Sequence, residues 1–212
     1  MTIAVVPIKD LESAKVRLMN RLTSSERRAL VLAMLNDVLS ALSQATGLSG
    51  IMVVTREREV AARAAGFGAE LLEDRASQGH TAAIELAARE LERRGEPAML
   101  CVPGDVPRLR PEEIAAVLCA LEPAPSVVFV PSRDGRGTNA ALVAPPRGFS
   151  LRFGEPSFEP HVARAKELGL RTAVVRLPGL GLDLDTPHDL DVFLQEPSAT
   201  ETYRFLRQRS AT

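Results

Sequence analysis

Acidic side chains follow two apolar runs of this chain in patterns that suit the chemistry of a divalent cation. The sharper pattern is the segment LDLD at 182–185, in which an extended backbone places Asp183 and Asp185 on one side. Two like charges at that spacing repel each other, so the pair favours a bound cation. Asp105 follows another apolar run, beside Gly104, and is either the cap of a turn or a third ligand for a hard divalent cation.

Basic side chains follow the first apolar run. Lys9, Lys15 and Arg17 lie close together there, within a stretch from Pro7 to Leu18 that contains no glycine. The glycine fingerprints of dinucleotide-binding folds and of P-loops are therefore absent. The spacing leaves two interpretations open, a solvated basic loop and a loop that meets the phosphates of a nucleotide.

Glycine, hydroxyl and amide groups form a third set of candidates. The segment GRGTN at 135–139 is either a hairpin-like turn or a place where backbone N–H groups and the hydroxyl of Thr138 meet an anion. Ser157 is predicted to cap a helix whose free N–H groups also suit phosphate or carboxylate. Gly154 would let a ligand approach the backbone. His161 either packs inside the protein or donates a hydrogen bond to substrate.

The arrangement of apolar segments predicts the scaffold that positions these groups. Short β-branched runs alternate with helical patterns, which predicts an α/β domain over residues 1–195 with a mostly parallel sheet covered by helices on both faces. Ligands bind such sheets outside the carboxyl ends of the strands, where the candidates fall. The predicted strands are 3–8, 51–55, 69–72, 99–102, 127–130, 140–143 and 172–177. The predicted helices are 24–45, 57–65, 81–94, 111–121, 158–168 and 187–194.

Local signals fix two helix starts and leave the C-terminal end weakly defined. Thr23 and Glu26 form a predicted capping box, and Thr186 is a predicted N-cap with Asp189 in the first turn. Residues 196–212 are predicted to be a poorly constrained C-terminal tail that contains a short basic helix at 203–209.

Composition excludes several classes of protein. The 212 residues include 26 Lys and Arg against 27 Asp and Glu, and a net charge of −1 argues against broad nucleic-acid binding. No apolar stretch reaches the ~18 residues of a membrane span. The first residues lack the pattern of a secretory signal, which predicts a cytoplasmic protein. Cys101 and Cys119 lie in apolar runs and are predicted to be buried free thiols.

Five segments, taken in order, resemble one family. They are PIKDLESAKVRL, GDVP, GRGTNA, FGEPSFEPH and LDLDTPHDL, and the resemblance covers residues 3–194, nearly the whole chain. They are similar to the guanylyltransferases of coenzyme F420 biosynthesis, the family named for 2-phospho-L-lactate guanylyltransferase. Some bacterial members act instead on phosphoenolpyruvate or 3-phosphoglycerate. The resemblance implies a nucleotidyltransferase sheet of the glycosyltransferase-A type.

The resemblance also implies a reaction and a set of site residues. GTP and a phosphorylated three-carbon acid, with phosphoenolpyruvate the first expectation, would give a guanylated diphosphate and pyrophosphate. Catalysis is expected of Lys15, Arg17 and Asp105. Mg²⁺ is expected on Asp105, Asp183 and Asp185. Contacts to the acid are expected from Thr138, Asn139, Gly154, Ser157 and His161, and contacts to the nucleotide from Pro7, Lys9, Lys15, Arg17 and Gly79.

Two other functions stay open at this point. One is a molybdenum-cofactor or sugar-phosphate nucleotidyltransferase, although those enzymes typically carry a glycine-rich N-terminal loop. The other is a non-catalytic nucleotide-binding protein, although a site without function has no reason to keep closely spaced carboxylates. The expected partners are GTP and the acid, without nucleic acid or membrane. An edge strand or the basic tail can also serve a homodimer.

Overall fold

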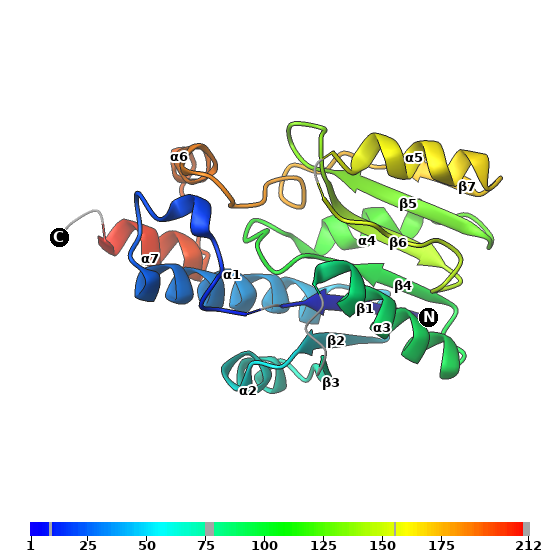
Figure 1. Ribbon diagram of the computed structural model, residues 1–212, viewed down its shortest axis with the longest axis horizontal. Helices are drawn as coiled ribbons and strands as arrows, with labels where there is room; N and C mark the ends of the chain where they lie inside the picture. Colours follow the sequence, from blue (N-terminus) through cyan, green and yellow to red (C-terminus); the bar gives the residue numbers. More distant parts are fainter. Residues whose placement is uncertain (9, 75–78, 155, 210–212) are drawn as a thin grey trace.

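A computed structural model describes residues 1–8, 10–74, 79–154 and 156–209, and in these residues seven strands form one sheet between two layers of helices (Figure 1). All seven predicted strands are confirmed to within a few residues. The strands are β1 (Thr2–Pro7), β2 (Gly50–Thr55), β3 (Glu70–Glu73), β4 (Ala98–Cys101), β5 (Ser126–Pro131), β6 (Thr138–Ala144) and β7 (Arg171–Val174).

The sheet is mostly parallel, as the sequence predicts, with the order β3-β2-β1-β4-β6-β5-β7. Only β6 among the described strands runs against its neighbours, since it pairs antiparallel with both β4 and β5. The reason is the short connection at 132–137, which joins β5 to β6. Parallel neighbours need a crossover of a dozen or more residues, whereas a connection of this length permits a hairpin.

Helices cover both faces of the sheet. They are α1 (Ser24–Gln44), α2 (Arg58–Gly66), α3 (His80–Arg93), α4 (Pro111–Cys119), α5 (Phe158–Glu167), α6 (Pro187–Gln195) and α7 (Glu201–Arg209), with a 3-10 turn, η1, at Val16–Leu18. Side chains of α1, α4, α6 and α7 share one buried apolar cluster with alternate residues of β1. Side chains of α3 and α5 form the second cluster on the opposite face. Both predicted caps are confirmed, because Thr23 with Glu26 and Thr186 with Asp189 form capping boxes.

A bulge lies where β5 and β6 meet the carboxyl edge of the sheet. Val130 is paired with Ala140, whereas Pro131 is paired with Thr138, so Asn139 is the extra residue in β6. Bulges disrupt the alternation of side chains and re-aim them, often beside functional sites. Here the bulge separates the directions of Thr138 and Asn139, which contact different parts of the protein.

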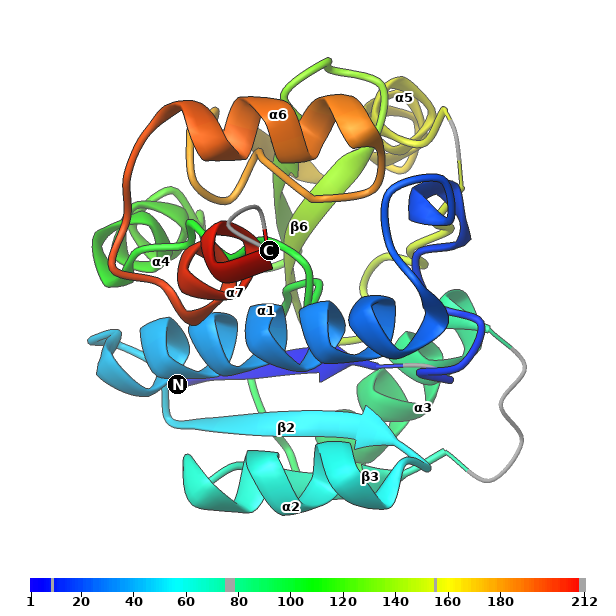
Figure 2. The same ribbon diagram turned by 90° about the vertical axis from the view of Figure 1, so that its left-hand side faces the viewer.

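Residues 201–209 pack against the domain, which corrects the prediction of a poorly constrained tail over these residues. The predicted basic helix exists and begins earlier, at Glu201, and it lies beside α1 (Figures 1 and 2). Leu206 is buried in the cluster that contains α1. A second correction concerns the cysteines, because Cys101 is buried but Cys119 is exposed at the end of α4. None of the described helices has the length and apolar character of a membrane span.

Asp37 of α1 attaches this terminal helix, and its removal is expected to destabilise the fold. Its carboxylate accepts the backbone N–H groups of Glu201 at 2.7 Å and Thr202 at 2.9 Å, which are the first orphan donors of α7. We expect Asp37→Ala to lower the free energy of unfolding by about 1–2 kcal/mol in urea titration. Ser43→Ala, at an exposed position of α1, is the control and should change it by less than about 0.5 kcal/mol. Equal effects of the two substitutions would contradict this role.

Candidate active site

The predicted chemical groups converge at the carboxyl edge of the sheet. Lys15 follows β1, Asp105 follows β4, and Asp183 and Asp185 follow β7 in the segment that leads to α6. Three parallel strands therefore deliver these side chains to one edge, as expected for open α/β sheets.

Lys15 joins two of the carboxylates directly. Its Nζ lies 2.6 Å from Oδ2 of Asp105 and 2.5 Å from Oδ1 of Asp185. The Lys15 side chain is only 8% exposed, so its ammonium is held in a largely water-free position. Burial alone would lower the pKa of Lys15, but the charges of Asp105 and Asp185 outweigh burial and raise the pKa above its ordinary value. Lys15 is thus a fixed positive charge over the whole working range of pH.

The backbone of Lys15 is unusual. Its φ of 55° and ψ of 38° place it in the left-handed region, and no other described non-glycine residue has a positive φ. Left-handed conformations cost an L-residue roughly 1 kcal/mol, and such strain gathers at functional sites. The residue with this conformation is thus the one whose side chain pairs with Asp105 and Asp185, and η1 begins at the next residue.

Asp183 is held by a different neighbour. The amide of Asn139 donates one hydrogen bond to Oδ1 of Asp183 at 3.1 Å and another to the carbonyl of Leu180 at 3.0 Å. Burial, and then the charge of Asp105, raise the pKa of Asp183 to about 6. Asp183 is therefore a carboxylate whose ionised form lacks sufficient compensation from the protein. Asn139, expected to contact the acid, has both amide hydrogens engaged inside the protein.

The carboxylates suit a cation, although no described group of three or more His, Cys, Asp or Glu side chains is arranged as a ready metal site. The Lys15 ammonium lies between Asp105 and Asp185. Oδ1 of Asp105 is nevertheless buried without a hydrogen-bond partner. A buried carboxylate oxygen without a partner, next to Asp183 with its raised pKa, has the chemistry of an Mg²⁺ ligand. The assignment of Mg²⁺ to Asp105, Asp183 and Asp185 stays a prediction. The oxygen donors of these three side chains are compatible with it.

A cleft of about 580 Å³ opens beside these carboxylates, and we call it the central cleft. Asp183 and Asp185 line it together with three arginines, Arg17, Arg133 and Arg136. Arg133 forms a long ion pair, 3.7 Å, with Asp189 across the cleft. The sequence reasoning identified Arg17 but missed Arg133 and Arg136, although three charges in the short segment RDGR at 133–136 were a usable signal. A cleft that combines carboxylates with arginines fits a cation and a polyanion together.

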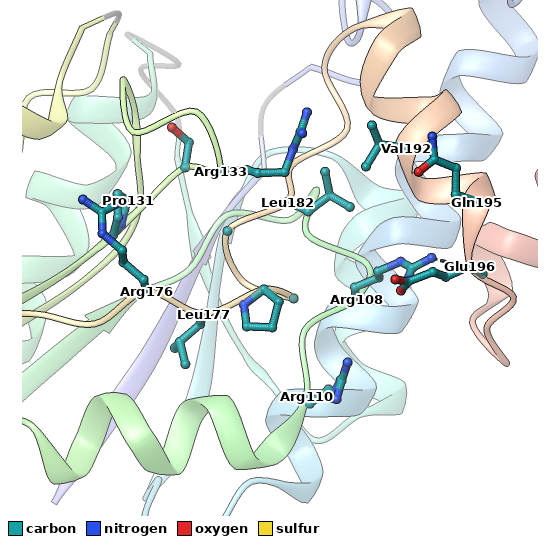
Figure 3. A pocket seen from close by; sticks show the side chains of 14 residues that line it. Arg108, Arg110, Pro131, Arg133, Arg176, Leu177, Leu182, Val192, Gln195 and Glu196 are labelled. Atoms are coloured by element: carbon teal, nitrogen blue, oxygen red, sulfur yellow. Dashed lines mark hydrogen bonds and ion pairs between the residues drawn. The ribbon is translucent and has the colours of Figure 1, made fainter.

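A smaller cleft of about 360 Å³ adjoins the central cleft and shares Arg133 and Leu182 with it (Figure 3). Arg108 lies on its wall and is directed toward Glu196. The Arg108 guanidinium bonds to the Glu196 carboxylate and to the carbonyls of Phe193 and Glu196, and its carbon lies 5.0 Å from the centre of the Phe193 ring. Arg108 therefore fastens the end of α6 rather than adding a charge to the central cleft.

The hydroxyl candidates gather on the other side of β6. Gly154, Ser157 and His161 line a further cleft of about 680 Å³, which we call the hydroxyl cleft. A Cβ added to Gly154 would meet nothing within 4 Å, so packing does not require this glycine, but its φ of 157° is a conformation that other residues rarely adopt. Ser157 stands at the N-cap of α5 as predicted, but its hydroxyl makes no cap bond and instead accepts the N–H of Thr138 at 3.0 Å.

His161 differs from the expectation of a direct substrate contact. The residue is 4% exposed, and both ring nitrogens have partners within the protein. Nδ1 pairs with the Thr138 hydroxyl at 2.9 Å, and Nε2 accepts the N–H of Arg152 at 2.9 Å. The ring therefore has no free nitrogen for a ligand, which corrects the prediction that it binds substrate. Burial lowers the pKa of His161 and favours the neutral ring.

The described residues among those predicted for the nucleotide lie at the same edge. Pro7 ends β1, and Gly79 precedes α3, which follows β3 and so also begins at the carboxyl edge. Gly79 has a φ of 111°, a conformation open in practice only to glycine. Lys9 lies outside the described residues. The nucleotide role of Pro7, Lys9, Lys15, Arg17 and Gly79 stays a prediction.

Glu113 supports the segment that carries the carboxylates, whereas sequence analysis predicted only that it lies in a helix. It is 7% exposed, and its carboxylate accepts the N–H groups of Gly179 at 2.7 Å and Leu180 at 3.1 Å. A Cβ at Gly179 would lie 2.2 Å from the carbonyl oxygen of Arg108, so this close approach requires glycine. Glu113 thus holds the chain four residues before Asp183.

Replacement of Glu113 is expected to loosen this segment. Glu113→Gln removes a charged acceptor from two buried N–H groups and should lower the free energy of unfolding by about 1–3 kcal/mol. Glu112→Gln, on the exposed side of the same turn, is the matched control and should stay within about 0.5 kcal/mol of the parent protein. Denaturant titration measures both. A loss of stability confined to Glu112→Gln, or absent from both variants, would contradict the role of Glu113.

Comparison with known families shows to which class of enzyme this site belongs. The family model described as "Guanylyl transferase CofC like" matches residues 2–211. This chain belongs to that family. It is therefore a nucleotidyltransferase, as the sequence resemblance implied, and the match includes α7.

Curated relatives and a solved structure agree with membership of the guanylyl transferase family. A protein of Conexibacter woesei named phosphoenolpyruvate guanylyltransferase is 38% identical over 191 residues, which are 90% of this chain and 86% of that protein. A 3-phospho-D-glycerate guanylyltransferase of Colwellia psychrerythraea is 34% identical over 188 residues, 89% of each chain. A 2-phospho-L-lactate guanylyltransferase of Methanothermobacter thermautotrophicus is 32% identical over 211 residues, 98% of this chain and 90% of that one.

Among solved structures, a protein from Desulfovibrio desulfuricans G20 titled as a nucleotide-diphospho-sugar transferase superposes with a TM-score of 0.79. The match covers 99% of this chain and 95% of that chain at 16% identity. A likeness at that identity supports the nucleotidyltransferase fold that the family resemblance implies.

Proposed function

We propose that this protein transfers GMP from GTP to the phosphate of phosphoenolpyruvate and releases pyrophosphate, as a step of coenzyme F420 biosynthesis. The observation that supports this acid most directly is the order of the relatives. The relative named for phosphoenolpyruvate is 38% identical, against 34% for the one named for 3-phospho-D-glycerate and 32% for the one named for 2-phospho-L-lactate. The other two acids are the alternatives.

The reaction needs no nucleophile from the protein. A phosphate monoester is largely ionised near neutral pH, since its second pKa is about 6. One of its oxygens attacks the α-phosphorus of GTP, a new P–O bond forms, the bond to the β-phosphate oxygen breaks, and that electron pair leaves with pyrophosphate. The difficulty is electrostatic, because two polyanions must meet and the leaving group gains charge.

The residues of the central cleft fit that difficulty. Lys15, permanently charged between Asp105 and Asp185, places a cation at the edge of the cleft. Arg17, Arg133 and Arg136 line the same cleft and can bind the phosphates in a fixed orientation, which lowers the entropic part of the barrier. Asp105, Asp183 and Asp185 would hold Mg²⁺, which when bound supplies further neutralisation of the phosphate oxygens.

A comparison of acids tests the proposal. The enzyme is incubated with GTP and Mg²⁺ and, separately, phosphoenolpyruvate, 3-phosphoglycerate or 2-phospholactate, and pyrophosphate release is followed with a coupled assay. We expect release that requires both the acid and GTP, with the highest kcat/KM for phosphoenolpyruvate. A higher value for another acid would change the assigned substrate. GTP binding in calorimetry with no release for any acid would instead indicate a non-catalytic nucleotide-binding protein.

A further inference from the structure

A buried hydrogen-bond chain connects the backbone of the hydroxyl cleft to Thr138. The N–H of Arg152 donates to Nε2 of His161 at 2.9 Å, and Nδ1 of His161 lies 2.9 Å from Oγ1 of Thr138. A ring nitrogen that accepts from an N–H group carries no proton. In the neutral imidazole the single proton is therefore on Nδ1, which donates to the Thr138 hydroxyl.

The same count of donors and acceptors determines which hydrogen bonds two hydroxyl groups accept. Oγ1 of Thr138 accepts from His161, and Oγ of Ser157 accepts the N–H of Thr138 at 3.0 Å. Each hydroxyl has one proton to donate, and neither proton has an acceptor among the described parts of the chain. Ser157 also lines the hydroxyl cleft next to Gly154. Thr138 is 6% exposed and lines neither the central cleft nor the hydroxyl cleft, so the Ser157 hydroxyl is the donor that can meet an anion.

Aromatic packing fixes the imidazole in place. The ring stacks on Phe129, with ring centres 5.6 Å apart and planes 6° from parallel. Phe149 and Phe153 contact it edge-on, each with centres 5.8 Å away. A ring held on three sides cannot turn to exchange its nitrogens, so the direction of the hydrogen bond is determined by the fold.

We infer that His161 is a positioning residue: it holds Thr138, whose N–H in turn holds the Ser157 hydroxyl as a hydrogen-bond donor, in the hydroxyl cleft, to an anionic group of the phosphorylated acid. This inference rests on the proposed function, and it replaces the predicted direct contact of His161 with substrate. Its role is to sharpen binding of the acid, and it takes no part in binding GTP or in the transfer of GMP.

Two substitutions separate the two hydrogen bonds of the ring. In His161→Asn the side-chain nitrogen can stand where Nδ1 stands and keep the bond to Thr138. In His161→Gln the side-chain oxygen can stand where Nε2 stands and keep the bond from Arg152, while the bond to Thr138 is lost. A purely structural role would make the two variants similar, because each retains one of the two bonds.

Steady-state kinetics of the two variants tests the inference. We expect His161→Gln to raise KM for the acid roughly tenfold and leave KM for GTP unchanged, and His161→Asn to keep KM for the acid within about twofold. Thr138→Val should raise KM for the acid by a similar factor, and adding His161→Gln to it should raise KM no further, because both changes remove the same interaction. Equal rises in KM for His161→Asn and His161→Gln would overturn the inference, as would additive effects in the double variant.

A measurement without turnover keeps this test separate from the proposed function. In ¹⁵N-labelled protein near pH 7.5, the nitrogen shifts of His161 should identify the tautomer protonated at Nδ1, and His161→Asn identifies the resonance by its loss. A ring protonated at Nε2 would overturn the inference whatever the activity. Wild-type protein that converts none of the three acids would instead overturn the proposed function, while the tautomer still reports on the hydrogen bond.

Discussion

Lys15→Met is expected to reduce kcat/KM for guanylyl transfer about a thousandfold, which is the effect of removing a preorganised charge from a site that stabilises phosphate. Methionine has nearly the length of lysine but no charge. It would leave Asp105 and Asp185, now joined through the Lys15 ammonium at 2.6 and 2.5 Å, without their shared partner. Two polyanionic substrates would then approach uncompensated carboxylates instead of a cation.

Two further variants give this prediction its controls. Lys166→Met makes the same change on the exposed face of α5 and should leave kcat/KM within about twofold of the parent enzyme. Lys15→Arg keeps the charge but replaces a compact ammonium with a planar fork, so we expect an intermediate loss. Rates are measured by pyrophosphate release with GTP, Mg²⁺ and phosphoenolpyruvate. Activity of Lys15→Met within tenfold of the parent enzyme would contradict a central role for Lys15.

Asp183→Asn is expected to abolish most activity and at the same time to stabilise the protein above pH 6. We expect a loss in kcat on the order of 10²–10³, because the variant lacks one of the carboxylates assigned to Mg²⁺. The gain in stability follows from burial and the charge of Asp105, which raise the pKa of Asp183 to about 6 in the folded protein. Ionised Asp183 therefore lowers the stability of the folded protein, whereas the neutral amide of Asn does not.

The sign of the pH dependence follows from the two pKa values of Asp183. The folded pKa, about 6, lies above the ordinary value of 3.8 for an aspartate. Between these values the folded protein keeps a proton that the unfolded chain has lost, so the stability contribution of Asp183 falls as pH rises from about 4 to 6. Removal of the carboxylate should therefore add about 1–2 kcal/mol at pH 8, after allowance for solvent screening, and nothing below pH 4.

Urea titrations at pH 8 and pH 4, with a chelator present, measure this difference. Asp191→Asn is the matched control, since the Asp191 side chain is 55% exposed and its ion pair with Arg21 is 3.4 Å long. The control should change stability by no more than about 0.5 kcal/mol at either pH. An Asp183→Asn variant that is less stable than its parent at pH 8, or that retains full activity, would refute the assignment.

The elements and the edge of the sheet that holds the site could be predicted from sequence. Continuous apolar runs such as those of β1 and β4 are typical of parallel strands buried on both faces, and Thr23 and Thr186 mark helix starts through local hydrogen bonds. The antiparallel direction of β6 follows from the short connection at 132–137, for which the sequence left both a hairpin-like turn and an anion-binding segment open. The packing of α7 depended on Asp37, which is 164 residues away from Glu201 and carries no local signal for that contact.

The sequence predicts which residues form the site, but not the contacts that these residues make with one another. The sequence predicts that Lys15, Asp105 and Asp185 lie at one edge of the sheet. It does not predict that the Lys15 ammonium lies between the two carboxylates, because Lys15 has a left-handed backbone conformation that lysine rarely adopts. The bulge at Asn139 re-aims that side chain toward Asp183, and Thr138 pairs with His161 instead of being free. The alternation of apolar and polar residues along a strand does not show where a bulge will lie.

Transfer of labelled oxygen tests the central claim most directly. Phosphoenolpyruvate that carries ¹⁸O in its non-bridging phosphate oxygens is incubated with GTP, Mg²⁺ and the enzyme, and the product is read by mass and by ³¹P NMR. Direct attack by the acid's phosphate predicts a guanylated product in which ¹⁸O bridges the two phosphorus atoms, so that the phosphorus from GTP shows an isotope shift. A product whose GTP-derived phosphorus carries no ¹⁸O, or the absence of any guanylated phosphoenolpyruvate, would contradict the account.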